Sequence, residues 1–187
     1  MAWNLETAKT RLGIEPGDMS KDTQIQAAMD TALSLCEKYC DRFFLQASET
    51  ETFYHTSTNV FQLKRFPIVS VSKGGDGAKV YQERGYLEFS RYVIEEEVEV
   101  EYLGGYSELP ADLEMALWLA FDNTYKELAP GGGGLSGGLK KLQITGVGSI
   151  DYGTSAASSG DSGGGFVGGL IPISSIGILD LYRLPGA

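Results

Sequence analysis

The sequence contains few of the residues that build metal and catalytic centres. Its 187 residues include one histidine and two cysteines. A structural zinc site normally takes four Cys or His ligands, so we expect no metal and no cofactor. Cys36 and Cys40 lie one turn apart in a helical pattern, on the same side of the helix. We interpret them as a reduced, buried pair, and zinc binding is the alternative.

Basic residues are also scarce. Lys and Arg number 15 against 25 Asp and Glu, which gives a formal net charge of -10. A protein that binds nucleic acid without regard to sequence depends on Lys and Arg to neutralise phosphates. The composition argues against that class. An acidic protein can still surround DNA without binding it.

Long apolar runs are missing as well. The most apolar stretch, Phe166 to Leu181, contains three glycines and a proline and is too short for a comfortable bilayer crossing. We therefore predict a docking segment and no membrane contact. Residues Met1 to Leu12 show no basic region followed by an apolar run, so we expect no signal peptide and synthesis in the cytoplasm.

Apolar residues recur at helical spacing in three stretches, about 4–12, 23–43 and 110–129. Between the second and third, residues 49–106 change to a period of two, which is typical of short strands. The clearest strand is Glu97 to Tyr102, where valines alternate with glutamates. We predict an α+β fold with a mainly helical bundle core, a small antiparallel β region and an extended C-terminal arm.

Glycine is unevenly distributed and crowds into the part of the chain after Pro130. We therefore divide the chain into a core, 1–130, and a Gly/Ser-rich arm, 131–187, whose apolar end is 166–184. A flexible tether that ends in an apolar segment suits docking on a partner. The predicted docking residues are Leu170, Ile171, Ile173, Ile176, Ile178, Leu179, Leu181, Tyr182 and Arg183.

Two short motifs suggest enzymes. Gly160-Asp161-Ser162-Gly163-Gly164 matches the sequence around the nucleophile of chymotrypsin-like proteases, and His55 precedes it as in that family. Ser162, however, lies in a low-complexity linker, and His55 lacks the local context of a catalytic base. The glycines at 132, 134 and 137 have the spacing of a dinucleotide-binding loop but follow a helix instead of a strand. We predict no enzymatic activity, and a serine hydrolase using Ser162 is the remote alternative.

The order of these elements resembles the phage head-tail connector, or adaptor, family. The resemblance rests on short stretches found in sequence along most of the chain, apart from the Gly/Ser linker. They are the opening helix Leu5 to Gly13, the helix end Tyr39 to Phe43, the stretch Leu63 to Val71, the strand end and helix start Tyr102 to Asp112, and the terminal stretch Ile178 to Arg183.

The resemblance implies a structural virion protein of the neck, which joins head to tail. Such a protein forms a homo-oligomeric ring, usually of twelve subunits, beneath the portal and extends the DNA channel. Its C-terminal arms reach the portal subunits, and its opposite side receives the next neck or tail component. DNA passes through without specific binding. The alternative within the neck is a stopper or head-completion protein at the next ring level.

A row of carboxylates carries one further hypothesis. Glutamates crowd the stretch around the clearest strand and could line the channel, where like charge would keep DNA from adhering. The alternative is a solvated strand face. The residues concerned are Glu95, Glu96, Glu97, Glu99 and Glu101.

Overall fold

The computed structural model describes residues 3–128, 141–144, 148–151, 166–167 and 171–184. Side chains are described for these residues except at 55–57, 91–96 and 129–170. These residues form two compact units. A helical unit comprises Trp3–Cys36 and Asp112–Leu181, and a β unit comprises Glu37–Ala111 together with 182–184. The chain therefore enters the β unit, returns to the helical unit and ends its described part in the β unit.

The helical unit begins with α1, Leu5–Leu12. The side chain of Asn4 caps this helix by accepting a hydrogen bond from the backbone N–H of Thr7 at 2.9 Å. Gly13 ends it with φ 68°, a left-handed conformation that costs glycine little. Capping at both ends fixes a helix that is only two turns long.

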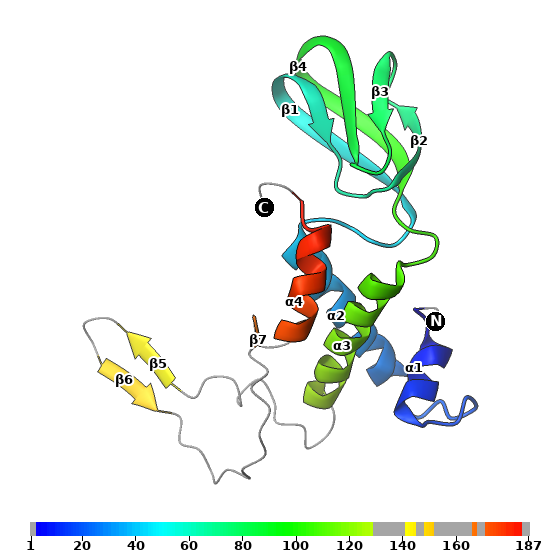
Figure 1. The fold of residues 1–187 in the computed structure, drawn as a ribbon, viewed down its shortest axis with the longest axis vertical. Helices are drawn as coiled ribbons and strands as arrows, with labels where there is room; N and C mark the ends of the chain where they lie inside the picture. Colours follow the sequence, from blue (N-terminus) through cyan, green and yellow to red (C-terminus); the bar gives the residue numbers. More distant parts are fainter. Residues whose placement is uncertain (1–2, 129–140, 145–147, 152–165, 168–170, 185–187) are drawn as a thin grey trace. The chain divides into compact units, whose positions relative to one another are not determined.

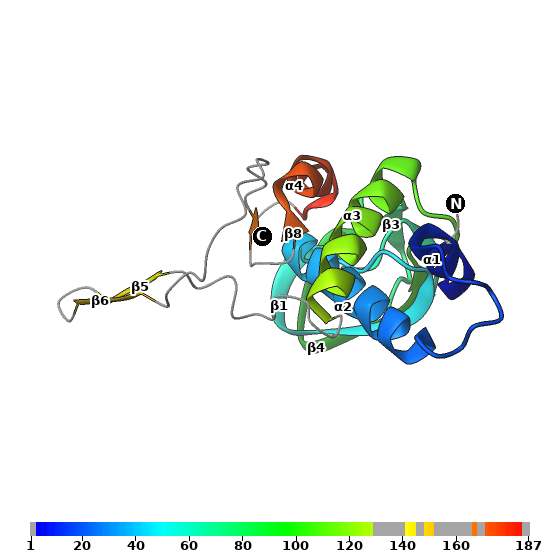
Figure 2. The ribbon, with the colours of Figure 1, turned by 90° about the horizontal axis from the view of Figure 1, so that it is seen from below.

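Three further helices complete this unit: α2, Asp22–Cys40, whose last turn belongs to the β unit, α3, Ala111–Leu128, and α4, Ile173–Leu179. In Figures 1 and 2, α3 lies beside α2 in both views. Their fully buried faces consist mainly of small and aliphatic side chains, which allow close helix packing. These are Ala8, Ile25, Ala28, Ala32, Leu113, Ala116, Leu117, Ala120 and Leu179.

Polar contacts at the rim tie α1 to its neighbours. The guanidinium of Arg11 donates to both carboxylate oxygens of Asp122 on α3, at 3.0 Å to Oδ1 and 2.7 Å to Oδ2. The Lys9 ammonium, 4% exposed, lies 2.6 Å from Asp22 at the start of α2. Trp3 packs on Trp118 with ring centroids 4.5 Å apart.

Among the described helices, none combines the length and the apolarity that a bilayer crossing needs.

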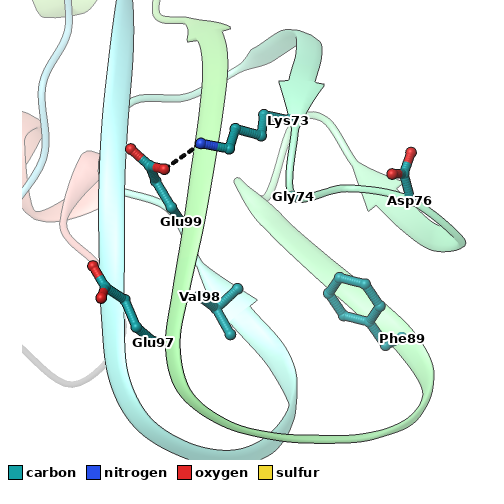
Figure 3. A pocket seen from close by; sticks show the side chains of 7 residues that line it. All are labelled: Lys73, Gly74, Asp76, Phe89, Glu97, Val98 and Glu99. Carbon is teal, nitrogen blue, oxygen red and sulfur yellow. Dashed lines mark hydrogen bonds and ion pairs between the residues drawn. The ribbon is translucent and has the colours of Figure 1, made fainter.

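The β unit is built on one antiparallel sheet of four strands: β1, Ala47–Gln62, β2, Ile68–Lys73, β3, Ala78–Tyr81, and β4, Tyr86–Gly104. β4 is central, with β1 along one edge. On its other edge β3 pairs with its first residues and β2 with its last. The sheet curls (Figure 3), and its core is aromatic and aliphatic, made by Phe61, Leu63, Phe66, Ile68, Leu87, Val98, Val100, Tyr102 and Leu184.

Two small antiparallel pairs lie in the region after α3. β5, Lys141–Ile144, pairs with β6, Gly148–Asp151, and β7, Phe166–Val167, pairs with β8, Ile171–Pro172. Within the described residues, β5 and β6 join no other strand. The chain then continues into α4 and a short 3-10 turn, Asp180–Tyr182.

The prediction of a mainly helical core with a small β region is wrong. The protein is α+β, but β1 has 16 residues and β4 has 19, and they pair along most of their length. The sequence pattern divides each of them into two short runs because polar residues interrupt the apolar alternation. Pairing between residues far apart in the chain makes each a single long strand, and no local pattern reports such pairing.

Candidate functional site

The predicted docking residues fall on both sides of the boundary between the units. Ile171 is 5% exposed and Leu179 is fully buried, so both belong to the core of the helical unit. Ser175, one turn before Leu179 on α4, donates a hydrogen bond to the backbone carbonyl of Ala116 at 3.3 Å. Part of this segment therefore stabilises the chain's own fold.

Other residues of the segment remain available for contact. Leu181 is 77% exposed and Ile173 is 54% exposed, while Ile176 and Ile178 are half-buried. Large apolar side chains at this exposure gain free energy if a partner removes them from water. Leu170 lies outside the described residues.

The end of the segment belongs to the β unit. Tyr182 makes edge contacts with Phe44 and Tyr106, with both ring centroids at 6.4 Å. The guanidinium of Arg183 lies 5.6 Å from the ring centroid of Tyr39. The backbone N–H of Leu184 donates to the carbonyl of Cys40 at 3.0 Å, and its side chain joins the sheet core. These contacts fix the described end of the chain.

Three glutamates of the predicted carboxylate row have described side chains. Glu97, Glu99 and Glu101 alternate along β4 and face Tyr54, Thr52 and Thr50 of β1 in register. Residues directly opposite in an antiparallel pair share a face of the sheet, so hydroxyl and carboxylate groups lie together there. The side chains of Glu95 and Glu96 lie outside the described set.

Lys73 of β2 partly neutralises this row. Its ammonium makes a short ion pair with Glu99 and lies 3.6 Å from Glu101. The hydrogen bond with Glu99 raises the pKa of Lys73, and the charge of that carboxylate acts in the same direction. Figure 3 shows the pair at the edge of a cavity of about 590 Å³. The sequence analysis missed this cavity, which is lined by Lys73, Gly74, Asp76, Phe89, Glu97, Val98 and Glu99.

The sequence analysis also did not identify a buried cation, Arg42. Arg42 is 4% exposed, its guanidinium lies 3.4 Å from the ring centroid of Phe66, and it donates a hydrogen bond to that residue's carbonyl. The rings of Phe44 and Tyr106 lie 5.5 and 5.6 Å away. Burial lowers the pKa of Arg42. The aromatic-rich stretch around the end of the second helix could have indicated this contact. The sequence alone does not show which aromatic rings pack against the guanidinium.

The motifs that suggested enzymes gain no support. Ser162 and the glycines at 132, 134 and 137 lie outside the described residues, as does the side chain of His55. Cys36 and Cys40 are both fully buried. Within the described part of the chain, no three His, Cys, Asp or Glu side chains gather in a group that could hold a metal ion.

Solved structures with a similar fold come from phage-like particles. A chain in the neck of an empty gene transfer agent (GTA) particle, computed with C6 symmetry, aligns with TM-score 0.56 and 13% identity, over 93% of this chain and 83% of its own length. The two chains share a fold. A chain in the neck of the native GTA particle, computed with C12 symmetry, aligns with TM-score 0.54 and 14% identity, over 98% and 90% of the two chains.

A third similar structure is the virion of the native GTA particle. One of its chains aligns with TM-score 0.54 and 14% identity, over 89% of this chain and 80% of its own length. No protein-family model matches the chain, and no curated protein matches it. At these identities the alignments establish the fold, which includes both the helical and the β unit.

Proposed function

We propose that the protein is a non-enzymatic structural subunit of a phage-like virion neck. The observation that carries this proposal is the fold that nearly the whole chain shares with chains of GTA necks. Those necks were computed with C6 and C12 symmetry, which supports a ring of copies for this protein too. A connector ring of twelve subunits would dock on the portal on one side and receive a neck or tail component on the other.

The C-terminal segment supplies the portal contact in this proposal. Its exposed apolar side chains, Ile173 and Leu181, are held on a segment that Leu179 anchors in the helical unit and Leu184 in the β unit. Burying one such side chain is worth about 1.5–3 kcal/mol. Because the contact repeats around the ring, a modest gain per subunit is enough for a stable joint.

The carboxylate row would line the DNA channel of the ring. A surface of like charge keeps DNA mobile during passage. Reversing Glu97 and Glu99 to lysine should slow DNA ejection or leave DNA bound in the neck, as measured on assembled particles. Unchanged ejection would instead assign these carboxylates to an ordinary solvated face.

Binding to purified portal rings, scored by electron microscopy, tests the main proposal. Wild-type protein should add a ring of density to the portal, whereas the double substitution Ile173→Asp and Leu181→Asp should remove it while leaving the fold intact. Met19→Asp is the matched control, because Met19 is 78% exposed and lies outside the segment. Absence of portal binding by the wild type would reject the connector and favour a stopper at the next ring level.

A further inference from the structure

The exposed Leu181 lies between two anchored stretches of the C-terminal segment. Leu179, two residues earlier, is fully buried in the helical unit. Tyr182 and Leu184 follow in the β unit, where the Leu184 side chain is 7% exposed. Leu181 itself belongs to the 3-10 turn Asp180–Tyr182. An exposed side chain that is held by close neighbours on both sides has lost much of its conformational freedom before any partner arrives.

The anchor in the β unit is an aromatic seat, which we define as the side chains of Arg42, Phe44 and Tyr106. The ring of Tyr182 meets those of Phe44 and Tyr106 edge-on, at interplanar angles of 86° and 79°. Both centroid distances are 6.4 Å. Such pairs attract because the positive edge of one ring meets the negative face of the other. The seat therefore fixes both the position and the orientation of the Tyr182 ring.

Arg42 holds the rings of the seat together. Its buried guanidinium lies 5.5 Å from the ring centroid of Phe44 and 5.6 Å from that of Tyr106. Among the described residues no carboxylate forms an ion pair with Arg42, and its Nε has no hydrogen-bond acceptor. The cation depends instead on the electron-rich ring faces and on the carbonyl of Phe66, to which it donates. The guanidinium and the two rings thus stabilise one another.

The last described residues complete the attachment. The backbone N–H of Leu184 donates to the carbonyl of Cys40 at 3.0 Å, and the guanidinium of Arg183 lies over the ring of Tyr39. Each of the three residues after Leu181 therefore contacts its own chain. Leu181, in contrast, directs most of its side chain to solvent.

We propose that the seat controls docking, because it fixes the turn that carries Leu181. Tyr182 is then a positioning residue that the partner does not touch, although the sequence analysis grouped it with the docking residues. A side chain presented in place lowers the entropy that binding must remove, so affinity depends on residues outside the contact. The inference rests on the proposed function, in which Leu181 contacts the portal, and it names what controls that contact.

Hydrogen exchange of the free subunit tests the seat without any partner. Tyr182→Ala removes both edge contacts, so the amides of residues 181–184 should exchange roughly tenfold faster than in the wild type. Tyr182→Phe keeps the ring and should exchange like the wild type. Tyr54→Ala, which deletes a 66% exposed tyrosine of the same unit, is the matched control. Unchanged exchange in Tyr182→Ala would overturn the proposal, because the seat would then not hold the turn.

A double-mutant cycle in portal binding separates positioning from contact. The measured quantity is the protein concentration at which half of the portal rings carry an added ring in electron micrographs. Tyr182→Ala and Tyr106→Ala should each raise it roughly tenfold, and the two together should raise it no further, because either one disrupts the seat. If Tyr182 touches the portal directly, Tyr106→Ala alone will leave binding unchanged. That result, or losses that multiply in the double variant, would reject the positioning role.

Two controls accompany the cycle. The β4 amides of Tyr106→Ala must exchange as in the wild type; where they do not, Tyr106→Leu takes its place, since leucine keeps apolar volume without a ring. Wild-type protein that leaves portal rings bare rejects the proposed function and this inference with it. Wild-type binding that Tyr106 substitutions do not change rejects this inference alone.

Arg42→Met tests the cation separately. Methionine keeps an unbranched apolar chain among the rings but removes the charge. Exchange at residues 181–184 should become faster, because the cation no longer holds Phe44 and Tyr106 together. The urea midpoint of the protein should stay the same or rise, because an unpaired buried charge opposes folding. A lower midpoint with uniformly faster exchange across the β unit would instead make Arg42 an ordinary core residue and reject its place in the seat.

Discussion

The helical and β units satisfy their buried polar groups in different ways. In the helical unit some of these bonds are local: Thr124 donates to the carbonyl of Ala120 at 2.9 Å, and the Trp118 indole donates to Glu114 at 3.2 Å. Both partners lie one helical turn away. The apolar core around them is packed with alanines, which bring helix backbones close together.

The β unit connects residues far apart in the chain. The Tyr102 hydroxyl donates to Glu51 and accepts the backbone N–H of Arg65 at 3.0 Å. The guanidinium of Arg65 in turn donates to Glu49 at 3.0 Å and to the carbonyl of Leu45. This network spans β1, β4 and the segment between β1 and β2. We therefore expect the stability of the helical unit to depend mainly on close packing of its core. The stability of the β unit should depend more on its paired polar groups.

The largest expected effect concerns the packing of α4. Leu179→Ala removes a fully buried side chain and should lower the free energy of unfolding by about 2–5 kcal/mol. Tryptophan fluorescence in a urea titration is a suitable probe, because both tryptophans of the protein, Trp3 and Trp118, belong to the helical unit. Leu181→Ala, at a 77% exposed position, is the control and should change little. Equal losses of unfolding free energy in the two variants would mean that the Leu179 side chain is not packed in the core of the helical unit.

Overpacking tests the close approach of the helices. Ala28→Leu adds volume at a fully buried position of α2 and should cost about 1–3 kcal/mol. The neighbouring Ala27 is exposed, so Ala27→Leu should be almost neutral. The same fluorescence titration measures both. If Ala28→Leu is as stable as the wild type, the alanine-rich interface is looser than its buried areas indicate.

The matching test in the β unit removes a single hydroxyl. Tyr102→Phe leaves the Arg65 N–H without its acceptor and Glu51 without this donor, and should cost about 1–3 kcal/mol. Burial raises the pKa of Tyr102, so the hydroxyl remains a donor at neutral pH. Hydrogen exchange of the β4 amides reports this unit directly. Tyr54→Phe, at a 66% exposed site, should leave the exchange unchanged.

The same distinction explains how much the sequence revealed. The helices at Leu5–Leu12, Asp22–Cys40 and Ala111–Leu128 lie close to the stretches predicted from local spacing, because apolar periodicity and caps are local signals. The length of β1 and β4, the curl of the sheet and its cavity depend on pairing between distant residues. The alternation at Glu97 to Tyr102 correctly indicated one buried face, with Val98, Val100 and Tyr102 in the core.

The candidate site shows the same contrast between local sequence signals and long-range structure. Sequence composition identified the apolar C-terminal segment, but it could not separate the exposed Leu181 from the buried Leu179, since their side chains are chemically identical. Only the tertiary fold assigns one to the core and the other to the surface. Likewise, the acidic run was visible in the sequence, whereas its ion pair with Lys73 depends on how β2 pairs with β4.

The smallest expected effect concerns the partly buried carboxyl of Glu37 in the β unit. Burial raises the pKa of Glu37, although the Phe44 backbone N–H, at 2.9 Å, and the charge of Arg65 favour the ionised form. A carboxyl whose pKa is raised by folding binds its proton more tightly in the folded state. Its stabilising contribution is therefore complete below the unfolded-state pKa and is lost as the pH rises through the folded-state pKa.

Glu37→Gln removes this titration but retains an oxygen that can accept the Phe44 N–H. The wild type should therefore lose stability relative to this variant as the pH rises above the ordinary glutamate pKa of about 4.3 and through the raised folded-state pKa. Thermal unfolding followed by circular dichroism at several pH values measures the difference. Glu83→Gln, at an exposed site of the same unit, controls for the loss of one negative charge. A Glu37→Gln curve that runs parallel to the wild type would show that desolvation does not dominate at this carboxyl, and that the hydrogen bond and Arg65 compensate for it.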